Sequence, residues 1–434
     1  MLRLPPAIAL AAALAGAQDV PQAFIGARVI PIAGPEIENG TVVIHDGKIV
    51  AVGESSETAT PDSAERHDVA GKVIMPGFVD THSHAGNVEG GDGSGPMHPD
   101  ARALDSINVR DARLQKAQAG GITTSNIMPG SGHLLSGQTL YVKHRDGKTI
   151  DDLLIRRADG SLAYGVKMAN GTNSRRDPPF PGTRAKSAAL VRERFVRAAE
   201  YRDRVARAEG DLEKLPPRDL GLETLVDILE GKRVVHFHTH RHDDISTVLR
   251  LAEEFGFRVV LQHVSDGWLV ADQIAASPHV LGASLILIDS PGGKIEAKDN
   301  RLETARILDA AGVLTGFHSD DSITDSRLFN RMAALGVRAG MPRERALYGL
   351  TMAGAQMLEM EDRIGSLEPG KDADLIVLSG DPLSVYTQVL QTWVDGSKVF
   401  DRSNPKDRLY AEGGFGASHD QGAILHGIAK GEHE

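Results

Sequence analysis

The chain of 434 residues is too long for one small domain, and it suits one large catalytic domain with a smaller partner. Its 41% hydrophobic and 25% charged residues exclude a disordered or fibrous chain, and its formal net charge of −11 argues against a nucleic-acid partner. Since the sequence contains no cysteine, a metal would have to bind to His, Asp, Glu or a modified Lys.

The first residues have the pattern of a secretory signal. Arg3 precedes an apolar run over residues 7–14, and Ala15-Gly16-Ala17 then gives a small-x-small cleavage site. The run is too short to span a bilayer. A buried N-terminal helix is the alternative, but the basic residue and the cleavage site favour a signal peptide over residues 1–17. We therefore expect export to the periplasm or the cell exterior.

Short strands are predicted near both ends of the chain. Within residues 18–76, apolar runs at 24–30 and 41–44 precede an Asp46-Gly47 turn that is typical of a hairpin. Similar strands are predicted at 374–378 and 391–394, within residues 368–434. The two β-rich segments could pair into one small sheet domain, although they lie at opposite ends of the sequence.

Between these segments, over residues 77–367, apolar runs alternate with helical periodicity. This alternation is the βα pattern of a parallel sheet, and the length fits a (β/α)₈ barrel. Helices are predicted at 244–255 and 300–311. Strands are predicted at 73–75, 123–127, 164–168, 233–238, 258–263, 285–288 and 313–317.

Histidines and carboxylates gather at the C-terminal ends of these predicted strands, where the chemistry of a barrel is found. His82 and His84 end the first barrel strand, and residues two apart in a strand point to the same side. Two such imidazoles could bind one ion, although a lone His-x-His is a weak signal. The other strand ends carry His236, His238, His240, His242, His263, His318, Asp320 and Asp321.

Each cluster taken alone could be a surface or supporting group. Together, at successive strand ends, they favour a metal site, because four same-face imidazoles would otherwise each need a buried hydrogen-bond partner.

At these motifs the sequence resembles the amidohydrolase superfamily, specifically its imidazolonepropionase-like and Xaa-Pro-dipeptidase-like members. The resemblance rests on Gly-Lys-Val-Ile-Met-Pro-Gly-Phe-Val-Asp-Thr-His-Ser-His at 71–84 and on the central histidine cluster leading into Ile245. It extends to His263, to His-Ser-Asp-Asp at 318–321 and to the segment 365–377. The resemblance implies a metal-bearing barrel with a β-sandwich built from both terminal segments.

The resemblance also implies roles for individual residues. His82 and His84 match the metal ligands of the first strand, and His238 matches the ligand of the fifth. His263 matches the sixth-strand histidine, which binds a second metal in binuclear members and orients the catalytic water in mononuclear ones. Asp320 matches the eighth-strand aspartate, which both binds metal and acts as the general base.

On the same basis His240 and Arg241 would face the substrate, and Arg241 could bind a substrate carboxylate with both arms. His236 and His242 are expected to be structural or supporting residues, and His318 is expected to support the site.

Lys167 is the harder residue to interpret. Binuclear relatives use a carboxylated lysine on the fourth strand to bridge two metals, and Lys167 lies at that point of the sequence. A lysine at a strand end is more often solvated or ion-paired. The chain also departs from many close relatives, because it has Gly-Thr-Asn-Ser at 171–174 where they have Gly-Glu-Asn-Pro.

The ligand types imply one or two divalent ions per chain, with zinc expected first. Such an ion lowers the pKa of a bound water from ~16 to ~7 and supplies hydroxide at neutral pH, while Asp320 handles the proton. The expected reaction is hydrolysis of a C–N bond in an amide, a cyclic amide or a dipeptide, on a small-molecule substrate.

Two other functions stay open at this point. A deaminase of an aminated heterocycle would use the same site, and a binding protein could have kept the barrel and lost catalysis. The second is disfavoured because every matched ligand is retained. A homo-oligomer is possible.

Overall fold

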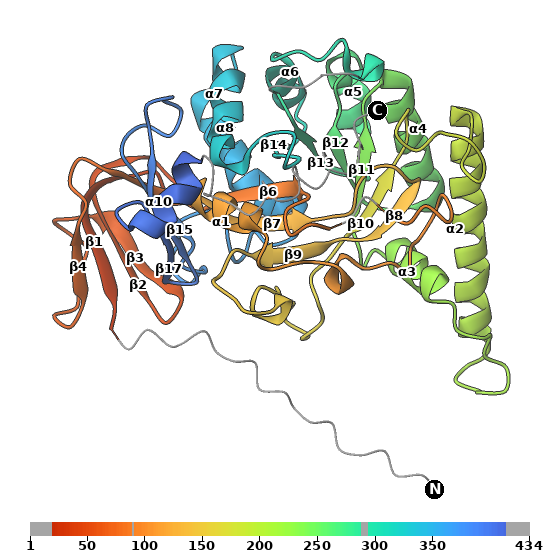
Figure 1. Ribbon diagram of the computed structural model, residues 1–434, viewed down its shortest axis with the longest axis horizontal. Coiled ribbons are helices and arrows are strands. Elements are labelled where there is room, and N and C mark those ends of the chain that lie inside the picture. Colours follow the sequence, from red (N-terminus) through yellow and green to blue (C-terminus); the bar gives the residue numbers. More distant parts are fainter. Residues whose placement is uncertain (1–19, 89–90, 288–293, 414–434) are drawn as a thin grey trace, which may run out of the picture.

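A computed structural model describes residues 20–88, 91–287 and 294–413 of the chain (Figure 1). The expected signal peptide at 1–17 lies outside the described residues, as does the end of the chain from 414 onward. The described residues form a mixed α/β fold. Among them, no helix combines the length and the apolar character that crossing a membrane requires.

Strands from the two ends of the chain pair into one eight-stranded sheet, here called the terminal sheet (Figure 1). Its order is β17-β16-β15-β5-β1-β2-β3, with β4 added on β1. The two ends meet where β5 pairs antiparallel with β15. The strands are β1 (Gln22–Val29), β2 (Ile37–His45), β3 (Lys48–Glu54), β4 (Glu65–Asp68), β5 (Val73–Pro76), β15 (Leu375–Leu378), β16 (Val389–Val394) and β17 (Ser397–Asp401).

The predicted pairing of the two terminal segments is therefore present. The hairpin between β2 and β3 turns at Asp46 and Gly47, whose φ angles of 49° and 72° suit the tight turn expected from Asp-Gly. Phe24 of β1 contacts Trp393 of β16 edge-on with 5.1 Å between ring centroids, although two strands lie between β1 and β16. The sheet therefore curls around its own core, while a two-sheet sandwich stays a prediction.

The central part of the chain forms a six-stranded and a three-stranded sheet. The six-stranded sheet has the order β14-β13-β12-β11-β10-β8, and it is parallel from β10 to β14. The three-stranded sheet has the order β6-β7-β9. The strands are β6 (Phe78–Ser83), β7 (Ile122–Ile127), β8 (Leu135–Gln138), β9 (Leu140–Lys143), β10 (Val166–Ala169), β11 (Val235–Thr239), β12 (Val259–His263), β13 (Val280–Leu285) and β14 (Thr315–Phe317).

These two sheets meet at both of their edges. Thr139 alone separates β8 from β9, so one edge of each sheet is formed by almost continuous chain. At the other edge, the backbone N–H of Asp320 donates to the carbonyl of His82 at 2.9 Å, and Ser83 forms a parallel bridge with Asp321. The strands are thus arranged like a barrel, whereas a fully closed eight-stranded barrel stays a prediction.

Helices follow most of the central strands, as the βα pattern predicts (Figure 1). The predicted helix 244–255 lies within α4, which buries Ile245, Val248 and Leu251 on its inner face. The helices are α1 (Ala112–Ala119), α2 (Arg184–Arg207), α3 (Leu220–Leu229), α4 (His242–Phe255), α5 (Ala271–Ala276), α6 (Thr304–Ala310), α7 (Asn330–Arg338), α8 (Arg343–Leu350), α9 (Met352–Met357) and α10 (Pro405–Glu412).

Two strands predicted for the central part are wrong in position. The strand predicted at 73–75 is β5 of the terminal sheet. The sequence predicts a strand at 285–288, whereas β13 ends at Leu285, and residue 288 lies outside the described residues. Ile286 and Leu287 are buried in the core just after the strand. An apolar run of this length cannot distinguish a strand from buried irregular chain.

A buried ion cluster joins the central strands to the terminal sheet. Lys143 at the end of β9 is fully buried, and its Nζ lies 2.7 Å from Asp372 Oδ2 and 3.2 Å from Asp374 Oδ1. It also bonds Asp395, which Arg145 contacts at 2.6 Å. Since Asp372 and Asp374 precede β15 and Asp395 lies between β16 and β17, the cluster fixes the terminal sheet beside the first central strands.

Candidate metal centre

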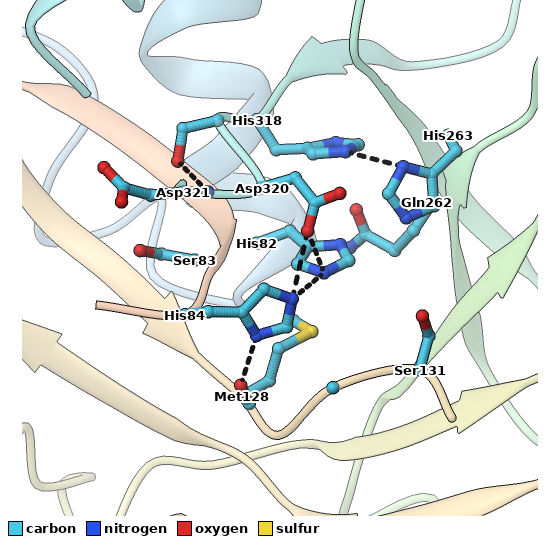
Figure 2. Close-up of polar contacts among 12 residues, drawn as sticks. His82, Ser83, His84, Met128, Ser131, Gln262, His263, His318, Asp320 and Asp321 are labelled. Atoms are coloured by element: carbon cyan, nitrogen blue, oxygen red, sulfur yellow. Dashed lines mark hydrogen bonds and ion pairs between the residues drawn. The ribbon is translucent and has the colours of Figure 1, made fainter. Parts of the chain in front are cut away.

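His82 and His84 present their ring nitrogens to each other at the end of β6. The two Nε2 atoms are 3.3 Å apart (Figure 2). The Nδ1 of His84 lies 2.7 Å from the carbonyl oxygen of Met128, which can only accept a hydrogen bond. The ring proton of His84 therefore sits on Nδ1, and its Nε2 lone pair faces His82.

Asp320, just beyond β14, completes this group. Its Oδ1 lies 3.0 Å from the Nε2 of His84 and 3.3 Å from the Nε2 of His82. Burial favours the neutral carboxyl, but the contact with His84 and the surrounding positive charges outweigh it and lower the pKa of Asp320. A buried carboxylate and two imidazoles at these separations are a ligand set that suits a divalent cation.

Lys167 of β10 points into the same group. Its side chain is fully buried, and its Nζ lies 2.9 Å from the Nε2 of His82 and 3.1 Å from the sulfur of Met128. Burial lowers the pKa of Lys167 to about 7, against an opposing effect of the Asp320 charge. A large fraction of this lysine is therefore a neutral amine near neutral pH, which is the reactive form of the side chain.

A second group of imidazoles lies at the ends of β11 and β12. The ring of His263 is 4.3 Å from that of His238 and 4.9 Å from that of His240, measured between centroids. Both nitrogens of His238, and the Nε2 atoms of His240 and His263, are buried without a hydrogen-bond partner among the described residues. Unpartnered buried imidazole nitrogens are costly, and a cation bound to their lone pairs would satisfy them.

The nitrogens and carboxylate oxygens of these groups lie within 4.8 Å of one another in three overlapping sets. The first set is His82, His84 and Asp320, the second is His238, His240 and His263, and the third joins His82 and His263 to His318. The donor chemistry therefore fits one or two divalent ions. The structure brings together every residue that the sequence suggested as a metal ligand: His82, His84, Lys167, His238, His263 and Asp320.

Two residues near this centre, Arg241 and His236, can be compared with the roles that the sequence predicted for them. The Nε and Nη2 of Arg241 donate to the two carboxylate oxygens of Asp243 at 3.0 and 2.6 Å, so this side of the guanidinium is already occupied. His236 lies between the hydroxyl of Tyr141 at 2.8 Å and the amide of Gln262 at 3.3 Å, which fits a structural role.

Asp80 of β6 is a supporting residue to which sequence reasoning gave no role. Its carboxyl accepts from the backbone N–H and hydroxyl of Ser319, at 3.0 and 2.5 Å, and from the N–H of His82 at 3.2 Å. It thus ties the segment that carries Asp320 to the strand that carries His82. Strand alternation places Asp80 on the same side as His82, and that alternation was the available signal.

The fold agrees with known proteins over most of the chain. A sequence model described as the amidohydrolase family matches residues 197–400. The crystal structure of an amidohydrolase from Thermotoga maritima MSB8 is 32% identical with a TM-score of 0.80, over 88% of this chain and 100% of that one. This chain belongs to the amidohydrolase superfamily.

Two proteins similar to this amidohydrolase in sequence are named after an activity. It is 28% identical over 394 residues to amidohydrolase tasK from Hapsidospora irregularis, and this match spans 83% of the chain but only 40% of that relative. It is also 28% identical over 403 residues to imidazolonepropionase from Rhizobium rhizogenes, over 83% of the chain and 92% of the relative. The superfamily resemblance predicted from the motifs is confirmed.

Proposed function

We propose that this amidohydrolase is a metal-dependent hydrolase that cleaves the C–N bond of an amide, a cyclic amide or a dipeptide. The observation that carries the proposal is the convergence of two imidazole groups, one carboxylate and one buried lysine at the ends of the central strands. Superfamily membership supports it, since relatives of this chain act as amidohydrolases and as an imidazolonepropionase.

In this proposal His82, His84 and Asp320 would hold one divalent cation, and His238 and His263 would hold a second. Lys167, in its carboxylated form, would be a ligand shared by the two. Zinc is the proposed metal, because imidazole and carboxylate ligands suit it. When bound, such an ion acidifies water and polarises a carbonyl group. Support comes from both ring nitrogens of His238 and from the Nε2 of His263, which are buried and have no partner among the described residues.

Asp320 would act as the general base and then as the general acid. Its carboxylate takes a proton from the attacking water while a C–O bond forms at the carbonyl carbon, and it returns that proton to the nitrogen as the C–N bond breaks. His240 would face the substrate, since its Nε2 has no partner while its Nδ1 lies 2.8 Å from the hydroxyl of Ser265. Arg241 would have to leave Asp243 before it could bind a substrate carboxylate.

We further propose that the central strands are the (β/α)₈ barrel of this superfamily and the terminal sheet its β-sandwich. The contacts that join β6 to the segment after β14 support the first proposal. The chain would be exported after removal of residues 1–17.

The test uses the chain without residues 1–17, with its metal measured by elemental mass spectrometry. Dipeptides, N-acyl amino acids, cyclic amides and aminated heterocycles are then assayed for both carboxylate and ammonia release. We expect C–N cleavage that a chelator abolishes and zinc restores. Ammonia released from heterocycles alone would identify a deaminase. A protein that binds no metal after reconstitution would contradict the proposal.

A further inference from the structure

A row of hydrogen bonds leads from the interior of the central strands to the second imidazole group. The hydroxyls of Thr81 and Ser284 are 2.6 Å apart, and the Ser284 hydroxyl lies 2.9 Å from the Nδ1 of His318. The Nε2 of His318 lies 3.1 Å from the Nδ1 of His263 (Figure 2). Thr81, Ser284 and His318 are completely buried, and His263 is 3% exposed.

The hydrogen bonds of this row can all donate toward Thr81 or all donate toward His263. The direction decides whether the Nε2 of His263 carries a lone pair or a proton. A neutral imidazole has one N–H and one lone pair, whereas a hydroxyl can both donate and accept. If His263 donates from Nδ1, then His318 donates onward to Ser284, and the Nε2 of His263 presents a lone pair. If the row starts from Thr81 instead, the Nε2 of His263 presents an N–H, which cannot bind a cation.

Two other histidines of the centre are also contacted at Nδ1. The Nδ1 of His84 faces the carbonyl of Met128 at 2.7 Å, and that oxygen can only accept, so the direction there is fixed. The Nδ1 of His240 faces the hydroxyl of Ser265 at 2.8 Å. In His263 the partner is another imidazole, so the direction depends on the residues behind it.

The surroundings of His263 favour the direction that leaves a lone pair on its Nε2. This atom is buried without a hydrogen-bond partner, and no acceptor for an N–H is found there among the described residues. Its ring neighbours are His238 and His240, which also have unpartnered buried nitrogens. An N–H pointing into this group would be buried unsatisfied, whereas lone pairs from several rings could share one cation.

We propose that His318, supported by Ser284 and Thr81, is a positioning residue that keeps the proton of His263 on Nδ1 and so turns its Nε2 lone pair toward a second cation. This inference rests on the proposed function, and it makes the row a requirement for binding two ions. The first ion, held by His82, His84 and Asp320, does not depend on the row.

The experiment titrates zinc into metal-free protein against a chromophoric chelator and resolves the first and second equivalents. His318→Leu removes the group that accepts from His263, and Ser284→Ala removes the group that accepts from His318. We expect them to weaken the second equivalent by ~10–100-fold and to leave the first unchanged. His318→Gln should bind nearly as the unmodified chain does, because its amide oxygen can accept from the Nδ1–H of His263.

Ser125→Ala is the matched control. Its hydroxyl contacts the Nε2 of His144 at 2.7 Å, and both side chains are buried, but this serine–histidine pair belongs to neither imidazole group. It should bind both equivalents normally, so a loss in Ser284→Ala would not reflect the removal of a buried hydroxyl in general. Thermal unfolding of each variant checks that it is folded.

The outcomes separate the two proposals. A chain that binds no zinc overturns the proposed function. A chain that binds one equivalent overturns the positioning role and the proposed second cation, but leaves a hydrolase with one metal. A Ser284→Ala variant whose second equivalent is as tight as or tighter than normal overturns the positioning role alone. Tighter binding in Ser284→Ala would show that the row runs in the opposite direction.

Discussion

The Nζ of Lys167 lies 2.9 Å from the Nε2 of His82, so the lysine amine faces the nitrogen with which His82 would bind a cation. An ammonium group there would compete with that cation. Burial lowers the pKa of Lys167 to about 7, so the side chain loses its proton near neutral pH. The resulting neutral amine can add carbon dioxide.

We therefore expect Lys167→Ala to lose binding of a second zinc and to recover part of it when formate or propionate is added. Because the amine becomes neutral as pH rises through about 7, metal reconstitution with bicarbonate should be faster at pH 8 than at pH 6. Elemental mass spectrometry after reconstitution measures both effects. Two equivalents in Lys167→Ala without added carboxylate would rule out the bridge.

Asp320→Asn should keep its metal and lose turnover. Asparagine retains an oxygen that can bind a cation, but it cannot take the proton of the attacking water. The expected fall in kcat is ~10²–10⁴-fold, the usual range for general acid–base catalysis. Asp321→Asn is the control, because Asp321 is buried but its carboxylate accepts from Ser326 and not from the centre. A metal-replete, active Asp320→Asn variant would contradict the assigned role.

Asp80→Ala should weaken metal binding although Asp80 is not a ligand. The change removes the hydrogen bonds that join Ser319 to the strand of His82, so Asp320 and His82 are no longer fixed together. We expect a loss of ~10–100-fold in zinc affinity by chelator titration. Asp111→Ala, which removes the N-cap of α1, should cost about 1 kcal/mol of stability and leave zinc affinity unchanged. Equal zinc affinity in the two variants would contradict this role of Asp80.

Sequence patterns predicted the elements whose conformation is set by residues close together in the chain. The Asp46-Gly47 turn follows from two residues that tolerate positive φ, and α4 follows from its 3.6-residue period. The strand-end histidines were found because strand alternation and parallel strands bring such residues to one edge.

Features that depend on partners distant in sequence were not predictable. The partner of Lys143 is a set of carboxylates more than two hundred residues away, and no local pattern links them. The pairing of Arg241 with Asp243 is local, but it competes with the expected substrate contact, and motif matching does not evaluate that competition. The row through Ser284 and His318 likewise depends on register between strands.

Lys143→Met should destabilise the fold strongly. It removes the buried cation shared by Asp372, Asp374 and Asp395, and leaving carboxylates buried without their partner typically costs ~3–5 kcal/mol. Lys48→Met is the control, since Lys48 also contacts Asp372 at 2.6 Å but its side chain is 50% exposed. That change should cost at most about 1 kcal/mol. Urea unfolding measures both, and similar losses would show that the cluster contributes little.

Asp374 should make the stability of the same cluster depend on pH. Burial raises the pKa of its carboxyl to about 6 against the attraction of Lys143, and its Oδ2 has no hydrogen-bond partner among the described residues. Between about pH 4 and pH 6 the folded chain therefore keeps a proton that the unfolded chain has released, so stability falls as pH rises through this range. Asp374→Asn stays neutral and removes this dependence. Urea unfolding at pH 4.5 and 6.5 should show that the unmodified chain loses stability relative to Asp374→Asn over this interval, by at most about 3 kcal/mol. If the two chains change in parallel, the carboxyl of Asp374 is already ionised at the lower pH.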